Sequence, residues 1–446
     1  MRAAAALVAL ALAAGGCAEQ PPERRDWNVV LLLVDTLRAD HLGVYGYERD
    51  TSPALDAFAA ASVVFADHRS QAPCTYPSVN SILTSRAPQR FTGRESGGFT
   101  IPAELPSLPR ILQARGYATL AVSASPIVRA TPTDLNRFGG FAGGFDLFLE
   151  RCLSRRAACV NRDAFTYLPL LRQPFFLYLH YMDPHAPYQQ PDFYEKRFFR
   201  GARGKKWVRA GDPYPIERLV EDGARDRIDP ADLSALIDLY DDSIGFFDQQ
   251  FALLLEALAE QDALENTLIA VIADHGESFL EHDKILHCRT LYEPEIRVPW
   301  LMRVPGVAGP VQVQGPTANL DVVPTILDLL GADVSGYGFD GRSHRRIIEG
   351  GGGRQVDGTV FADWGTLGSA TDGRFKLIAD RKAQTAALYD LATDSAEQRD
   401  LAAERTGDVR RLASELEAWQ RAATQDGAEE EGESVEDQLK ALGYLQ

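Results

Sequence analysis

Short, unbroken runs of apolar residues recur along the chain and predict buried strands. These runs lie at 27–34, 118–122, 175–179, 268–273 and 298–304. Runs of Val and Leu without polar alternation are typical of parallel strands that are buried on both faces of a sheet. Between them, residues 236–258 place apolar side chains at three- and four-residue spacing, which predicts an amphipathic helix. Strands that alternate with helices predict an α/β fold, with a mostly parallel sheet covered by helices on both faces.

From about residue 351 the pattern changes. Strand-like runs at 359–364, 375–379 and 387–391 are separated by turn residues, and a final amphipathic helix is predicted at 409–422. We therefore divide the chain into a main domain, 27–350, and a small antiparallel α+β subdomain, 351–446. The acidic segment 426–437 within this subdomain carries seven carboxylates and no basic residue, which is typical of a solvated spacer.

Composition narrows the class of protein. With 446 residues, 45% hydrophobic and 24% charged, the chain is long enough for a large core, and its values are those of a globular protein, which excludes a disordered or fibrous one. A formal net charge of -17 argues against a nucleic-acid partner, because phosphate backbones are bound by an excess of Lys and Arg.

The N-terminal residues 1–17 have the pattern of an export signal. Arg2 precedes a short run of Ala, Leu and Val at 3–14, too short to span a bilayer, and Ala14, Gly15 and Gly16 lead to Cys17. Small residues before a cysteine resemble a bacterial lipobox, so we expect an exported lipoprotein of the periplasm or outer membrane, held to the membrane only by lipid on Cys17. Plain cleavage near Gly16 is the alternative. Residues 18–26 would form a linker.

Four cysteines remain once Cys17 is set aside. In an oxidising compartment, Cys152 and Cys159 either close a small disulfide loop or remain free thiols, and the sequence leaves both open. Cys74 and Cys288 complete the set. No CxxC pattern is present, which argues against a structural zinc site.

Candidate metal ligands follow two of the predicted strands. Asp35 ends the run 27–34, and Asp274 and His275 follow the run 268–273. In open α/β sheets, ligands bind at the carboxyl ends of the strands. Two carboxylates and an imidazole at that edge can hold a divalent cation. Taken alone, Asp35 is better explained as a turn or helix-cap residue, and the Asp-His-Gly sequence also occurs in ordinary loops.

A hydroxyl and several imidazoles complete the candidate chemistry. Thr75 lies just before Pro77, which suits the first turn of a helix, so Thr75 is either a cap or a nucleophile near a helix N-terminus. Five of the eight histidines fall in the strand-end segments between residues 180 and 287, which indicates a polar cleft. They are His180, His185, His275, His282 and His287.

An ordered set of motifs carries a family resemblance. The segments VDTLRADHLG, APCTYPSVNSILTSRAP, PFFLYLHYMDPHAPY, ADHGESFLEH and LYEPEIRVPWLMRVPG occur in that order. Together they closely resemble the sulfatase branch of the alkaline phosphatase superfamily, over nearly all of the chain after the signal. The resemblance implies an alkaline-phosphatase-like fold: a mixed, mostly parallel sheet sandwiched by helices, with a small C-terminal subdomain.

The resemblance also implies roles for individual residues. Asp35, Asp274 and His275 match the metal ligands of the family, and Thr75 matches the nucleophile, which also approaches the metal. His185 matches a histidine that contacts the substrate anion. His287 falls near the basic group that contacts the anion or the leaving group, with Lys284 as a weaker candidate.

Three departures from the family pattern bear on the reaction. Alignment on Pro77 puts Thr75 at the nucleophile and Val79 where the family has arginine, while Cys74 is one residue out of register. A threonine cannot be oxidised to formylglycine, so we do not expect that cofactor. Thr36 replaces a second aspartate, which removes one metal ligand. Asp283 and Cys288 stand where the family commonly has glycine.

These features predict a metal-dependent hydrolase of sulfate or phosphate esters, and the Thr75 nucleophile favours phosphoester or phosphodiester substrates. The cation would be a single Ca, Mg or Mn, with zinc also compatible; a second site formed by Asp183, His185 and His287 is the alternative. The substrate would be an anionic ester on a glycan, lipid or small molecule. Two other functions remain: a phosphoglycerol- or phosphoethanolamine-type transferase, and a catalytically idle binding lipoprotein.

Overall fold

The computed structural model describes residues 24–91, 100–133, 135–136, 139–152, 156–200, 206–353 and 355–425. The predicted signal and lipobox, most of the linker and the acidic segment 426–437 lie outside these residues. None of the helices in the described part of the chain combines the length and the apolar character that a membrane span requires.

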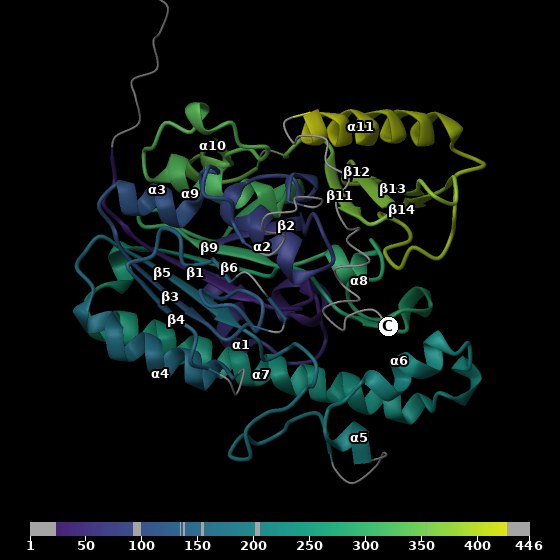
Figure 1. Cartoon of the computed structure of the whole chain (residues 1–446), viewed down its shortest axis with the longest axis horizontal. Coiled ribbons are helices and arrows are strands. Elements are labelled where there is room, and N and C mark those ends of the chain that lie inside the picture. The colour runs from purple at the N-terminus through teal and green to yellow at the C-terminus, as the bar shows by residue number, and fades with distance from the viewer. Residues whose placement is uncertain are drawn as a thin grey trace, which may run out of the picture.

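A mixed, mostly parallel sheet forms the centre of the molecule (Figure 1). Among the described strands of this sheet, β9 alone runs antiparallel to its neighbours, β2 and β6. The central strand β1 is fully buried along its whole length, as its unbroken apolar run predicts. In spatial order the strands are β10 (Val311–Ala318), β2 (Val63–Arg69), β9 (Trp300–Arg303), β6 (Thr267–Ile272), β1 (Asn28–Val34), β5 (Phe175–Tyr181), β3 (Ala118–Ser123) and β4 (Leu147–Leu149).

Helices cover both faces of this sheet because side chains alternate along each strand. In β1, Val30, Leu32 and Val34 pack on one face, and their neighbours Val29 and Leu31 pack on the other. The first face is covered by α1 (Pro53–Ala59), α4 (Ala157–Tyr167) and the long α7 (Pro230–Glu260). The second is covered by α2 (Thr75–Thr84), α3 (Leu108–Ala114), α9 (Val322–Leu329) and α10 (Arg345–Glu349).

The C-terminal region forms a second, antiparallel sheet, as the sequence predicts. Its strands are β11 (Val360–Trp364), β12 (Leu367–Thr371), β13 (Phe375–Asp380) and β14 (Thr385–Asp390). Helix α11 (Thr406–Gln425) packs on this sheet through Leu412 and Leu416. In Figure 1 the small sheet lies at the upper right, next to the strand ends of the main sheet.

A buried ionic cluster joins the small sheet to the main one. Lys376 of β13 is fully buried, and its Nζ atom lies 2.8 Å from carboxylate oxygens of both Glu293 and Glu397. Arg69 of β2 donates to both oxygens of Glu293 at 2.9 Å. Glu293 begins α8 (Glu293–Ile296), which follows the loop that carries His287. The C-terminal sheet is thereby fixed to the segment next to the candidate site.

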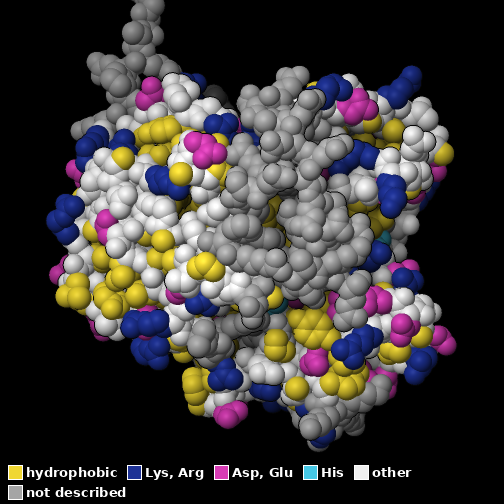
Figure 2. Space-filling model, in the orientation of Figure 1, with side chains coloured by type: hydrophobic (Ala, Val, Ile, Leu, Met, Phe, Trp, Pro, Cys, Tyr) yellow, Lys and Arg dark blue, Asp and Glu magenta, His cyan; other side chains and the backbone are white. Residues whose placement is uncertain are grey.

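On the face seen in Figure 2, basic and acidic side chains of the described residues are interspersed, without a large area of basic charge.

Candidate active site

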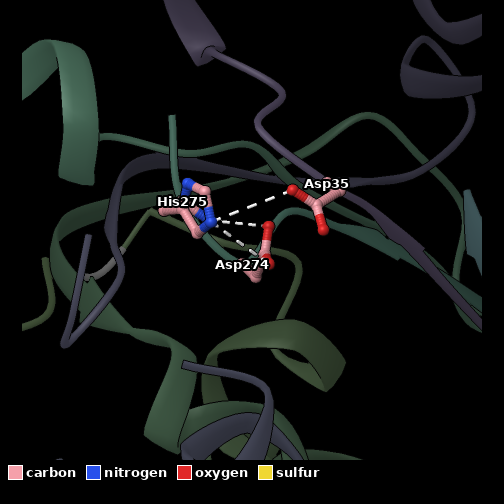
Figure 3. A group of neighbouring side chains, drawn as sticks. All are labelled: Asp35, Asp274 and His275. Atoms are coloured by element: carbon pink, nitrogen blue, oxygen red, sulfur yellow. Dashed lines mark hydrogen bonds and ion pairs between the residues drawn. The ribbon is translucent and has the colours of Figure 1, made fainter. Parts of the chain in front are cut away.

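The carboxyl edge of the sheet brings three predicted metal ligands together (Figure 3). Asp35 follows β1, and Asp274 and His275 follow β6, which is the parallel neighbour of β1. One ligand atom from each of these residues lies within 4.8 Å of the other two, and all three side chains are fully buried. The register of two adjacent strands therefore creates the cluster.

The hydroxyl of Thr75 lies against the same cluster. Thr75 is the first residue of α2, after Cys74 in extended conformation, so its side chain stands at the helix N-terminus. Its Oγ1 atom is 3.2 Å from Nε2 of His275 and 3.5 Å from Oδ2 of Asp35. The hydroxyl is thus placed beside two of the candidate ligands, where positive charge from the helix end also falls.

Unpaired oxygens at the cluster suit a cation. Oδ1 of Asp35 and Oδ2 of Asp274 are buried without a hydrogen-bond partner, as is Oγ1 of the adjacent Thr36. Buried oxygens of this kind are costly unless an ion or a donor meets them. Nδ1 of His275 lies 3.0 Å from the carbonyl oxygen of Gly276, which assigns its proton to that side and turns Nε2 towards the carboxylates.

The pKa shifts of the three candidate ligands bear on cation binding as well. Burial opposes ionisation of Asp35, but the hydrogen bond with His180 and the nearby imidazoles hold its pKa below the usual range. Burial, and then the charge of Asp35, raise the pKa of Asp274 well above its usual value. Burial lowers the pKa of His275 to about 3, so the ring is neutral and able to bind a metal at neutral pH. The donor set therefore fits a hard divalent cation.

His185 and His287 lie next to the cluster. The His287 ring centroid lies 4.6 Å from that of His275 and 4.9 Å from that of His185. Nδ1 of His287 is 2.8 Å from Oε1 of Glu277, and the Tyr188 hydroxyl donates to Oε2 of Glu277 at 3.1 Å. Burial raises the pKa of Glu277 to about 8 and lowers the pKa of His287 to about 4.

Glu277 is a residue whose role sequence reasoning missed. It directly follows Asp274, His275 and Gly276, in a motif that drew notice for its metal ligands alone. A carboxylate close to two catalytic candidates in sequence was the available signal, because histidines at functional sites are commonly oriented by an acidic partner.

The other predicted histidines separate into two groups. His180 reaches the cluster, with Nε2 3.3 Å from Oδ2 of Asp35 and Nδ1 3.1 Å from the Tyr178 hydroxyl. His282 does not reach it and stacks on Tyr292 with ring centroids 3.5 Å apart. Lys284 lies just after the turn at Glu281–Asp283, and within the described part of the chain its side chain makes no hydrogen bond or ion pair with the cluster.

Asp183, the alternative ligand for a second metal, is engaged elsewhere. Its Oδ1 atom accepts a hydrogen bond from the backbone N–H of Ala157 at the start of α4, at 3.0 Å. Among the residues that the structure describes, the one group with metal-ligand geometry is Asp35, Asp274 and His275.

The departures from the family pattern have visible consequences. Thr36 adopts φ 57°, a left-handed conformation that is uncommon for a β-branched residue. Val79 is fully buried in the apolar core, so it offers the site no charge. Asp283 and Cys288 both have φ 61°. Glycine adopts such a conformation without strain, which explains physically why it suits these two positions.

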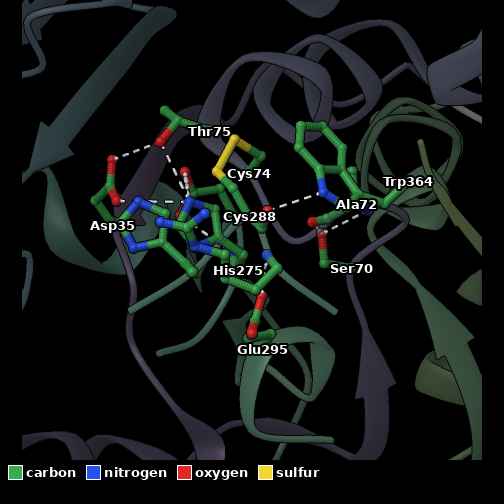
Figure 4. Close-up of a disulfide and its surroundings, with 12 residues drawn as sticks. Asp35, Ser70, Ala72, Cys74, Thr75, His275, Cys288, Glu295 and Trp364 are labelled. Carbon is green, nitrogen blue, oxygen red and sulfur yellow. Dashed lines mark hydrogen bonds and ion pairs between the residues drawn. A yellow bond between two sulfur atoms is a disulfide. The ribbon is translucent and has the colours of Figure 1, made fainter. Parts of the chain in front are cut away.

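The described residues contain two disulfides, one that the sequence left open and one that it did not indicate. Cys152 and Cys159 are bonded, which selects the disulfide over free thiols. Cys74 and Cys288, which the sequence left unpaired, form a second disulfide across 214 positions of the chain (Figure 4). This bond joins the residue before Thr75 to the residue after His287.

Comparison with known proteins identifies the family. The family model described as "Sulfatase" matches residues 27–332, more than half of the chain. The chain belongs to the sulfatase family. Human arylsulfatase A is 25% identical over 391 residues, covering 74% of this chain and 68% of the relative. Mouse iduronate 2-sulfatase is 24% identical over 350 residues, covering 65% of this chain and 61% of the relative.

Solved structures support the same fold. The phosphonate monoester hydrolase of Agrobacterium radiobacter superposes with a TM-score of 0.70 at 21% identity, covering 89% of this chain and 96% of that one. This sulfatase-family protein is therefore an ester hydrolase by class, with the alkaline-phosphatase-like architecture expected from its motifs. Since the chain spans about two thirds of the length of the curated relatives named above, its own substrate is a separate question.

Proposed function

We propose that this sulfatase-family protein is a metal-dependent hydrolase of sulfate or phosphate esters, with phosphoesters or phosphodiesters preferred, and that Thr75 is its nucleophile. The observation that carries the proposal is the position of the Thr75 hydroxyl, 3.2 Å from Nε2 of His275 and 3.5 Å from Oδ2 of Asp35 at the N-terminus of α2. A hydroxyl beside ligands of a cation, at a helix end that favours anions, suits attack on a bound phosphoryl group.

Asp35, Asp274 and His275 would hold one divalent cation, within reach of the Thr75 hydroxyl. A bound cation supplies Lewis acidity, which lowers the pKa of a nearby hydroxyl and screens an anionic ester. Two carboxylates with one imidazole suit calcium, magnesium or manganese, and zinc is compatible with the same donors.

The remaining residues would act on the substrate itself. Thr75 Oγ1, whose proton is released to solvent as its pKa falls, attacks the phosphorus in line with the leaving oxygen. The new O–P bond forms as the bond to the leaving oxygen breaks, which gives a phosphothreonine (still esterified when the substrate is a diester) and an alcohol. His185 and His287 contact the non-bridging oxygens, or give a proton to the leaving oxygen once the bound anion has raised their pKa. Glu277 holds the His287 ring in one orientation through the hydrogen bond to Nδ1. Water then cleaves the phosphothreonine and regenerates the Thr75 hydroxyl.

The choice of phosphate over sulfate rests on the nucleophile. Thr75 has no route to formylglycine, on which sulfate cleavage in this family depends, whereas a threonine alkoxide can attack phosphorus directly. The fold neighbour from Agrobacterium radiobacter is a phosphonate monoester hydrolase, so phosphorus ester chemistry occurs on the same architecture. An anionic ester of a glycan, lipid or small molecule is the proposed substrate class.

We also propose that the protein is exported and carries lipid on Cys17. The pattern of residues 1–17 supports export, and so do the disulfides Cys152–Cys159 and Cys74–Cys288, since disulfides persist in oxidising compartments. Mass spectrometry of the N-terminal peptide from cells tests lipidation: an acylated Cys17 supports it, and an unmodified N-terminus near Gly16 contradicts it.

The decisive experiment is a substrate panel of an aryl sulfate, a phosphate monoester and a phosphate diester, after metal repletion. The wild type should turn over one or both phosphate esters faster than the aryl sulfate. Thr75→Ala should lose about 1000-fold or more in kcat, because the attacking oxygen is gone. Thr84→Ala is the matched control: Thr84 ends the same helix, is also buried, and its hydroxyl donates to the carbonyl of Asn80.

Three outcomes contradict parts of the proposal. Sulfate turnover that survives Thr75→Ala refutes the nucleophile. Absence of turnover with every ester and metal favours the idle binding lipoprotein. The convergence of four residues argues against that function: Asp35, Thr75, Asp274 and His275. Transfer of phosphate to added glycerol in preference to water identifies a transferase, since the same phosphothreonine would serve both reactions.

A further inference from the structure

We propose that the disulfide Cys74–Cys288 is a positioning element of the reaction, which holds the nucleophile Thr75 and the histidine His287 at a fixed separation. This proposal rests on the function proposed above and concerns the same site. It assigns a role to two residues that are not among the proposed metal ligands, nucleophile or substrate contacts.

Such an element is needed because the metal ligands and His287 lie on different structural elements. Asp35 and Asp274 follow neighbouring strands at the centre of the main sheet. His287, in contrast, follows a separate ribbon formed by β7 (Ser278–Phe279) and β8 (Ile285–Leu286), which pair through two residues each. A two-stranded ribbon of this length has little stability of its own. The orientation of His287 relative to Thr75 therefore depends on contacts outside the ribbon.

One of the contacts outside the ribbon is covalent, and it is the disulfide (Figure 4). Cys74 is the N-cap residue of α2, directly before Thr75, and Cys288 directly follows His287. The two Cα atoms are 4.8 Å apart. The backbone N–H of Cys288 also donates to the carbonyl of Pro73 at 2.8 Å. The disulfide and this hydrogen bond connect the residues directly before Thr75 to the residue directly after His287.

The surroundings of the bond hold the backbone at Cys288 in place. Cys74 and Cys288 are 4% and 5% exposed. The indole Nε1 of Trp364, from strand β11 of the C-terminal sheet, donates to the carbonyl of Cys288 at 2.9 Å. Cys288 is held at φ 61°, a conformation that a non-glycine residue keeps only when its surroundings impose it. Each of these contacts fixes the backbone next to His287.

The metal ligands do not share this dependence. Asp35, Asp274 and His275 come from the main sheet and the segment directly after it, and none of the three lies on β8 or the loop that follows it. Loss of the disulfide should therefore lower the rate of the chemical step and leave metal affinity in place. This separation distinguishes a positioning role from a general contribution to folding.

The test compares two variants in which one disulfide each is removed. In Cys74→Ala/Cys288→Gly, glycine accepts φ 61° without strain, so the variant removes the bond and not the backbone conformation. Cys152→Ala/Cys159→Ala is the matched control, because that bond joins residues only 7 positions apart and ends in the first turn of α4. For each, kcat and KM are measured with bis(4-nitrophenyl) phosphate under saturating manganese, and manganese affinity is measured by calorimetry.

We expect kcat of Cys74→Ala/Cys288→Gly to fall by about 10- to 100-fold, with manganese affinity within about threefold of wild type, since misplacement of reacting groups by about 1 Å has effects of that size. The control should change neither quantity by more than about threefold. A kcat that stays within about threefold of wild type overturns the proposal. A parallel loss of manganese affinity also overturns it, because it would show a structural role alone.

Failure of the proposed function is distinguishable from failure of this inference. If the wild type turns over no ester, the proposed function is wrong, and crystal structures of the wild type and of Cys74→Ala/Cys288→Gly decide the positioning role without turnover. Displacement or multiple positions of the Thr75 and His287 side chains in the variant support the role. Unchanged positions overturn it.

Discussion

Glu277 and His287 form a buried pair in which Oε1 of the carboxyl group lies 2.8 Å from Nδ1 of the ring. The Tyr188 hydroxyl donates a hydrogen bond to the other carboxyl oxygen at 3.1 Å, so the carboxyl group cannot rotate without breaking a second hydrogen bond. Such partners fix the tautomer and orientation of a functional histidine.

Replacement of Glu277 by Gln should lower kcat by about 10- to 100-fold, because an amide presents either a donor or an acceptor to Nδ1 and no longer fixes the tautomer. Kinetics with a phosphodiester at saturating metal measure the effect. Glu281→Gln is the control, since Glu281 pairs with Arg38 and not with the histidines. Equal activity of the two variants would show that Glu277 does not position His287.

Thr36→Asp should tighten the binding of manganese or magnesium. The change adds a carboxylate next to Asp35, and aspartate accepts the left-handed conformation at φ 57° more readily than a β-branched residue. We expect Kd, measured by calorimetry, to fall about 10-fold, equivalent to about 1.4 kcal/mol. Thr36→Asn matches the shape without the charge. If both variants bind metal equally, residue 36 does not face the ion.

The two disulfides should differ in their effect on stability. Cys74–Cys288 spans 214 positions and Cys152–Cys159 spans 7, and in the chain-entropy description the longer loop stabilises the native state by about 3 kcal/mol more. Denaturant unfolding of Cys74→Ala/Cys288→Ala and Cys152→Ala/Cys159→Ala measures both losses. A larger loss from the short loop would mean that the entropy of the unfolded chain does not dominate.

Lys376→Met should destabilise the protein by about 3–5 kcal/mol, because it leaves the buried carboxylates Glu293 and Glu397 facing each other without their shared cation. Unfolding monitored by tryptophan fluorescence measures the loss. Arg399→Met is the control, since its ion pair with Glu404 is exposed and should contribute nothing measurable. Addition of Glu397→Gln to Lys376→Met should restore part of the stability, and the absence of any rescue would contradict the electrostatic explanation.

Asp183 should make the stability of the protein depend on pH. Burial raises its pKa from 3.8 to about 7 in the folded state, so the protonated form is favoured on folding. The contribution is complete below pH 3.8 and is lost as the pH rises through about 7. Asp183→Asn keeps an acceptor for the Ala157 N–H and cannot ionise.

The free energy of unfolding of Asp183→Asn, relative to wild type, should therefore rise between pH 4 and pH 8 by up to about 4 kcal/mol. Chemical denaturation at a series of pH values measures the difference. A difference that stays constant over this range would mean that Asp183 ionises freely in the folded protein.

Much of the fold could be predicted because the central strands are buried on both faces. The run before Asp35 is apolar at every position from Val29 to Val34, and the structure buries each of those residues. The same property conceals strand direction: β9 is as apolar as its neighbours but runs antiparallel to β6. Strands β2 and β10 were missed since polar residues such as His68 and Gln314 interrupt their apolar positions.

The site was predictable to the extent that its residues lie at strand ends or carry family motifs. Asp35, Thr75, Asp274 and His275 converge, as the sequence requires of a metal site. The disulfide between Cys74 and Cys288 was not predictable, because no local pattern links residues so far apart in the chain and proximity arises only in the folded state.

The bond from the Trp364 indole to the Cys288 carbonyl has a practical consequence for protein engineering. A gene fragment that stops at residue 350 would encode every proposed ligand and nucleophile, yet it would lack this indole and the lysine that neutralises Glu293. It would also uncover Leu291 and Ile296, which pack against Ala362. For truncation, fusion or library design, the second sheet must be treated as part of the catalytic unit.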